Sequence, residues 1–186
     1  AATGHILVVR ALLAATDKPV PAALLDATRS LQPEVVRTLL DHGYSVHEQD
    51  RNGAGPLHVL GGFSATIKLP RTQTSIMDRP KRDWLQEVDR RQAAIAHMLL
   101  DTGASVAQND NSERTPLMLA ACARTSLTRQ TDPDEGAEMH EFAETDPVPY
   151  VRLLLDAGAD PKARDNRGNT AIHYAFRRGF MEESAP

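Results

Sequence analysis

The sequence predicts an all-α protein built from stacked helix pairs, with short hairpin-like turns and no substantial sheet. Three apolar, helix-like segments resemble one another, and a glycine ends the helical run in each of them. A second pattern begins at the same interval after each glycine. The first segments are VVRTLLDHGYSV at 35–46, IAHMLLDTGASV at 95–106 and YVRLLLDAGADP at 150–161, and the second patterns are GPLHVL at 55–60, TPLMLA at 115–120 and TAIHYA at 170–175. Repetition of one helical unit predicts a solenoid in which each unit contacts its neighbours.

The spacing of the repeats becomes regular once two insertions are taken out. The interval from Gly43 to Gly103 is longer than the interval from Gly103 to Gly158. Both intervals shrink to a period of about 33 residues when one insertion, within 64–93 or within 124–147, is removed from each. Each insertion then falls between the first and the second helix of one repeat.

This period of about 33 residues, together with the pattern T-P-L-H-x-A, resembles the ankyrin repeat. The resemblance implies a solenoid of helix pairs joined by β-hairpin-like fingers, over nearly all of the chain outside the insertions. Thr115 can cap the first helix of its repeat, with a proline at the first helical position. Glu113 stands where the family usually has the finger glycine. One finger position is held by Asp50, Asp110 and Asp165.

We interpret the chain as a single ankyrin-repeat domain at 1–186. The divisions are a capping helix and turn at 1–21, repeat one at 22–46, repeat two at 47–106, repeat three at 107–161 and a partial repeat four at 162–186. The capping helix is expected at about 5–15. Gly61 and Gly62 predict that the first helix of repeat two stops near Leu60, because each glycine costs about 1 kcal/mol in a helix.

The two insertions differ in charge. The first carries seven basic and four acidic residues, and the helical phase of its second half extends the second helix of repeat two back to about residue 81. Trp84 would lie near the start of this helix, either packed within the insertion or free for a partner. The second insertion has seven carboxylates and no lysine or arginine over 131–147, a pattern typical of solvated segments. We expect it to lie weakly along the basic helix extension, near Arg82, Arg90 and Arg91.

Composition narrows the classes of function. A net charge of −4 argues against a general nucleic-acid binder, because phosphate binding usually requires a basic surplus. The single cysteine, Cys122, cannot form an internal disulfide, which favours a reducing compartment, cytoplasmic or nuclear. No uncharged apolar run approaches the roughly 18 residues of a membrane span, so we expect no membrane partner.

No constellation of residues predicts catalysis, a metal or a cofactor. His140 and Glu141 match the first two residues of the zinc-protease motif H-E-x-x-H, but Glu144 occupies the position of the second histidine. The resemblance implies that His58 and His173 are the repeat's own histidines, which tie neighbouring fingers together. We therefore expect no enzyme activity and no cofactor.

The resemblance implies a protein–protein interaction module that binds through its concave surface of fingers and first helices. The basic fourth repeat would suit an acidic segment of a partner protein. Trp84 is a secondary candidate for binding. The alternative function is a regulatory ankyrin array within a larger enzyme or channel whose catalytic part lies outside this chain. The predicted partner-binding residues are Gln49, Arg51, Asn52, Phe63, Asn109, Asn111, Ser112, Arg114, Arg164, Asn166, Arg167, Tyr174, Arg177 and Arg178.

Overall fold

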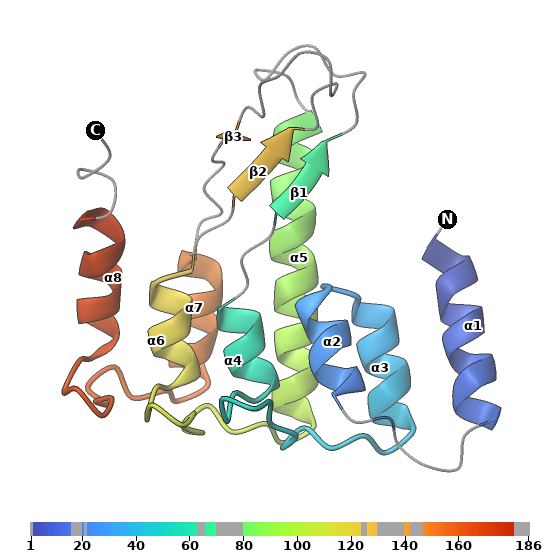
Figure 1. Cartoon of the computed structure of the whole chain (residues 1–186), viewed down its shortest axis with the longest axis horizontal. Helices are drawn as coiled ribbons and strands as arrows, with labels where there is room; N and C mark the ends of the chain where they lie inside the picture. The colour runs from blue at the N-terminus through green and yellow to red at the C-terminus, as the bar shows by residue number, and fades with distance from the viewer. Residues whose placement is uncertain are drawn as a thin grey trace.

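A computed structural model describes residues 2–15, 20, 22–62, 66–69, 80–123, 126–129, 140–141 and 147–180 of the chain (Figure 1). The elements in chain order are α1 (Ala2–Ala15), α2 (Ala23–Arg29), α3 (Pro33–Asp41), α4 (Pro56–Gly61), β1 (Thr66–Leu69), α5 (Pro80–Asp101), α6 (Pro116–Ala121), β2 (Ser126–Arg129), β3 (His140–Glu141), α7 (Val148–Asp156) and α8 (Ala171–Phe180).

The helices stack in two rows. The first helices α2, α4, α6 and α8 pack on one another in that order, and the second helices α3, α5 and α7 do the same. Helix α2 also packs on α3, α4 on α5 and α6 on α7, so that the rows are joined by helix pairs (Figure 1). This arrangement is the predicted all-α solenoid of stacked helix pairs, and the fold class is confirmed.

The apolar core lies between the two rows. Leu24, Leu60 and Leu117 enter it from the first helices, while Ile95 and Leu154 enter it from the second helices. Each of these five residues is at most 2% exposed. Burial of one such side chain is worth roughly 1.5–3 kcal/mol, and every pair supplies residues to the same continuous cluster.

The helix ends follow the predicted signals. The Thr115 hydroxyl oxygen accepts the Met118 N–H at 3.4 Å, with a proline as the first residue of α6. Helix α4 ends at Gly61, close to the stop predicted near Leu60. After α5, Gly103 adopts a φ of +97°, which lets the next amide donate to the Leu99 carbonyl at 2.9 Å. Glycine fits this left-handed position because it has no Cβ.

Helix α5 is longer than the other described helices. It has 22 residues from Pro80 to Asp101, or about 33 Å, and its N-terminal half projects from the stack (Figure 1). The predicted backward extension to about residue 81 is therefore confirmed. Trp84 lies in the early turns of this helix, but its side chain is outside the described residues. Arg90 and Arg91 both pair with Glu87 of the same helix.

The insertions add a small sheet that the sequence did not predict. Strand β1 follows α4 and pairs in parallel with β2, which follows α6, while the two-residue β3 pairs antiparallel with β2. The two insertions leave equivalent points of adjacent repeats, so the strands run side by side in one direction and satisfy each other's backbone groups. The three strands contain ten residues and do not change the fold class. Most of the acidic segment over 131–147, including its predicted position on α5, lies outside the described residues.

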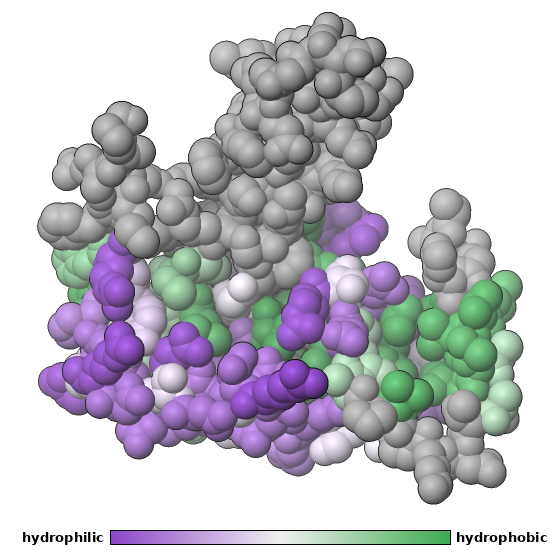
Figure 2. Space-filling view, viewed as in Figure 1, coloured by the Kyte–Doolittle hydropathy of each residue, from purple (hydrophilic) through white to green (hydrophobic). Residues whose placement is uncertain are grey.

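The two ends of the stack differ in their surfaces. Helix α1 packs on α3 and leaves Leu7, Val8 and Leu12 exposed, which makes the hydrophobic area over α1 in Figure 2. Hydrophilic residues cover the loops at the foot of the stack in the same view. None of the described helices is both long and apolar enough to cross a bilayer.

A buried hydroxyl joins the second helix of one pair to the first helix of the preceding pair. The Tyr150 hydroxyl of α7 donates to the Leu57 carbonyl of α4 at 2.9 Å, and burial raises the pKa of Tyr150. Tyr150→Phe keeps the ring but removes this bond, so we expect the free energy of unfolding in urea to fall by about 1 kcal/mol. The m-value should not change. An unchanged free energy of unfolding would show that the bond contributes nothing to the stack.

Candidate protein-binding surface

Three fingers share one hydrogen-bonded arrangement. In the middle finger, Oδ1 of Asp110 accepts the backbone N–H groups of Ser112 at 2.8 Å and Arg114 at 2.9 Å. Asp50 and Asp165 accept the corresponding pairs of N–H groups in their own fingers. Burial alone would raise the pKa of Asp110, but the hydrogen bonds from Arg114 and Ser112 outweigh it and lower the pKa. The carboxylate therefore holds each turn in shape.

Neighbouring fingers are bonded to each other through the backbone. The N–H of Asn111 donates to the Asn52 carbonyl at 2.8 Å, and the N–H of Asn166 donates to the Ser112 carbonyl at 3.1 Å. The Asn111 side-chain amide adds a bond to the Arg51 carbonyl at 3.1 Å. The three finger tips therefore form one continuous edge.

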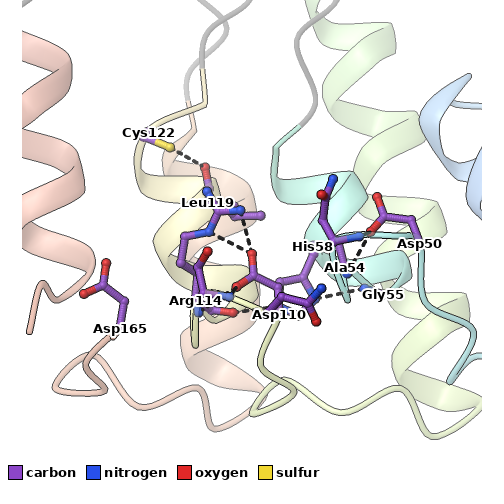
Figure 3. A network of polar contacts seen from close by, with 12 residues as sticks. Asp50, Ala54, Gly55, His58, Asp110, Arg114, Leu119, Cys122 and Asp165 are labelled. Atoms are coloured by element: carbon purple, nitrogen blue, oxygen red, sulfur yellow. Dashed lines mark hydrogen bonds and ion pairs between the residues drawn. The ribbon is translucent and has the colours of Figure 1, made fainter. Parts of the chain in front are cut away.

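A buried histidine fastens the first finger to the second. Nδ1 of His58 accepts the Gly55 N–H at 3.2 Å, so the ring proton lies on Nε2, which donates to the Arg114 carbonyl at 2.9 Å (Figure 3). The predicted role of this histidine in tying neighbouring fingers is confirmed. Burial lowers the pKa of His58 and favours its neutral form. His173 accepts the Thr170 N–H at 3.2 Å in the same way, but its ring is exposed.

A pocket of about 340 Å³ opens where the first helices meet the fingers. Its lining residues come from α2, α4, α6 and the first two fingers, and they combine charged, polar and apolar groups. They include Arg29, Asn52, Val59, Gly62, Arg114 and Leu119. The pocket is large enough for one side chain of a bound protein. Among the described residues, no group of three or more His, Cys, Asp or Glu side chains is placed to hold a metal ion.

Most of the predicted partner-binding residues lie at the surface of the fingers and first helices. Ser112, Arg114 and Tyr174 are half-buried. The side chains of Phe63 and Arg178 fall outside the described residues, as does that of Trp84. The exposed residues are Gln49, Arg51, Asn52, Asn109, Asn111, Arg164, Asn166, Arg167 and Arg177.

Two of the half-buried predicted residues bond to the finger aspartates. The Arg114 guanidinium binds the carboxylate of Asp110 with an N–O distance of 2.6 Å (Figure 3). The Tyr174 hydroxyl donates to Asp165 at 2.7 Å, and burial together with this hydrogen bond raises the pKa of Tyr174 to about 12. Both side chains therefore stiffen the base of a finger. Arg29 also lines the pocket, but the sequence did not single it out because repeat one lacks the T-P-L-H pattern that would align it.

Comparisons with known proteins agree with this architecture. The family model described as ankyrin repeats (many copies) matches residues 139–182. The chain is 28% identical to ankyrin repeat and SOCS box protein 16 of Mus musculus over 165 residues, which are 85% of this chain and 33% of that protein. It is 27% identical to neurogenic locus notch homolog protein 1 of Danio rerio over 81% of this chain and 6% of that protein. A 32-residue stretch, 17% of this chain, is 53% identical to 8% of putative ankyrin repeat protein L92 of Acanthamoeba polyphaga mimivirus.

The fold and these similarities define a helical repeat protein. The chain is similar to ankyrin-repeat proteins over most of its length, and ankyrin repeats are protein–protein interaction modules. The chain spans about a third of the mouse relative and a much smaller part of the Danio rerio relative.

One position in each finger has a positive φ. It is a glycine in the first and last fingers and a glutamate in the middle finger. Gly53 and Gly168 have φ values of +75° and +79°, and Glu113 has +59°. A side chain in this region costs about 1 kcal/mol, so Glu113→Gly should raise the free energy of unfolding by roughly 0.5–1 kcal/mol. The matched variant Ser112→Gly, at a neighbouring position without a positive φ, should lower it. Equal changes in urea unfolding for the two variants would contradict this explanation.

The buried histidine predicts a pH dependence of stability. The pKa of His58 is lowered in the folded protein, so below its ordinary value of 6.5 the unfolded chain binds the extra proton more readily. The free energy of unfolding should therefore fall as the pH drops through this region, by at most about 1.4 kcal/mol per pH unit. His58→Gln should flatten the slope between about pH 7 and pH 5. A slope that survives in His58→Gln would have another origin.

Proposed function

We propose that this chain is a non-catalytic interaction module that binds a partner protein on its concave surface of finger tips and first helices. The continuous edge of fingers carries the proposal. Because Asp50, Asp110 and Asp165 fix each turn and the fingers bond to each other, the outward side chains are held in place before a partner arrives. Such preorganisation reduces the conformational cost of binding.

The charge of this surface supports an acidic segment as the bound part of the partner. Arg51, Arg164 and Arg167 are exposed on the fingers. The three finger aspartates are engaged with backbone amides, so the outward-facing charge is mostly positive. A carboxylate of the partner would meet arginines at the tips, and an apolar side chain would fit the adjoining pocket.

Site-specific photocrosslinking tests the proposed surface. A benzophenone amino acid is placed at Asn52 or Asn166 on the finger tips, and control proteins carry it at Arg37 or Arg152 on the second helices. All four positions are exposed. After irradiation in an extract of the source cells, we expect the same crosslinked protein from both finger positions and none of it from the controls. Crosslinks only from the second-helix positions would move the binding surface to the opposite side.

A further inference from the structure

The last first helix, α8, exposes positions that the preceding first helices bury. Leu57 of α4 and Leu117 of α6 are each 2% exposed, but the equivalent Ile172 of α8 is 61% exposed. Phe176 is 65% exposed, whereas the equivalent Gly61 of α4 is buried and the equivalent Ala121 of α6 is half-buried. Ile172 and Phe176 are four residues apart and therefore lie on one side of the helix. We refer to this side of α8, with His173, as the end face.

The difference follows from the stacking order. Helix α4 is covered by α5 and α6, and helix α6 is covered by α7 and α8. The described residues contain no helix beyond α8 (Figure 1). The end face is therefore equivalent to the sides of α4 and α6 on which the next first helix packs. A helix is the element that fits such a surface.

The end face also offers a hydrogen-bond donor. The Thr170 N–H and hydroxyl approach Nδ1 of His173 at 3.2 and 2.9 Å, which is the arrangement that places the proton of His58 on Nε2. Nε2 of His58 has the Arg114 carbonyl as its acceptor. Within the part of the chain that the structure describes, no acceptor reaches Nε2 of His173. A carboxylate or carbonyl of a bound helix could accept this bond.

The surroundings of the end face are basic. From Pro161 to Arg177 the chain carries four basic residues, and its one carboxylate, Asp165, is buried and bonded to Tyr174. Arg167 and Arg177 are exposed on the last finger and on α8. Carboxylates on a bound helix would complement these charges. Two copies that met end face to end face would instead bring two sets of arginines together.

Phe176 changes the distance at which a neighbouring helix can pack on the end face. At Gly61 an added Cβ would lie 2.9 Å from the Pro116 carbonyl oxygen, so this position permits the close approach of the next first helix. A phenylalanine ring at the equivalent place holds a neighbouring helix further away and supplies an apolar surface for its side chains.

We propose that the end face of α8 binds an acidic amphipathic helix of a partner protein. Its apolar stripe covers Ile172 and Phe176, and its flanking carboxylates meet Arg167, Arg177 and Nε2 of His173. Ile172, His173 and Phe176 lie outside the proposed concave surface, whereas Arg167 and Arg177 belong to both surfaces.

A pair of synthetic helical peptides tests the proposal. Each is about 18 residues, or five turns, with leucine on one stripe, and the other positions are mostly glutamate in one peptide and lysine in the other. Fluorescence anisotropy is used to titrate each labelled peptide with the 186-residue protein. We expect the glutamate peptide to bind at least about tenfold more tightly than the lysine peptide. Ile172→Ser with Phe176→Ser should weaken it by at least about tenfold, and His173→Ala by a smaller factor.

The matched control is Leu7→Ser with Leu12→Ser, which removes equally exposed apolar residues from α1 at the opposite end. It should leave the affinity for the glutamate peptide unchanged, and circular dichroism should show the same helix content in all variants. Equal binding of the two peptides, no binding of the glutamate peptide, or an equal loss in the α1 variant would overturn the proposal. Self-association that disappears in the α8 variant would overturn it in favour of a second copy. Crosslinking from Asn52 is independent of these outcomes and tests the concave surface by itself.

Discussion

The first helices of this solenoid approach so closely that their facing positions must be small. At Gly61, an added Cβ would lie 2.9 Å from the Pro116 carbonyl oxygen and 3.2 Å from the Ala120 nitrogen, so α4 and α6 meet almost backbone to backbone. This spacing brings the fingers into register. The bonds from Asn111 to Asn52 and from His58 to the Arg114 carbonyl can form only when adjacent repeats are held at this distance. A bulkier residue at Gly61 would therefore disturb the binding edge as well as the core.

The elements that the sequence predicted are those with local causes. The glycine after α5, the Thr115 cap and the stop of α4 each depend on a few neighbouring residues, and the structure has them where they were expected. Gly61 was interpreted as a helix breaker, and it does lie at the end of α4. Gly61 has a second role, because its lack of a side chain lets the backbone of α6 approach. This role depends on a distant part of the chain that begins at Pro116. The spacing of motifs in a sequence does not reveal a contact between two such distant segments.

The remaining features of the site depend on contacts between distant segments. The pairing of β1 with β2 arises because two insertions leave adjacent repeats side by side, and neither TIKL nor SLTR predicts its partner. Arg114 was predicted as a partner-binding residue from its finger position, whereas its guanidinium is held by Asp110. The family pattern fixes the position of a residue in the finger. It does not determine whether that residue's side chain faces a partner or its own turn.

The distribution of charge connects the structure of the fingers to their function. The finger aspartates accept hydrogen bonds from backbone N–H groups. The arginines of the last two fingers differ in whether they also bind such an aspartate. Arg114 is neutralised by Asp110, while Arg167 is exposed. A protein with a net charge of −4 can thus present a positive edge, because its aspartates are committed to the turns and many of its other carboxylates lie in the second insertion. Both insertions begin after first helices, at the ends opposite the fingers (Figure 1). With a Debye length of about 8 Å at physiological salt, a bound partner responds mainly to the charges nearest to it, which on this edge are the exposed arginines and not the net charge of the chain.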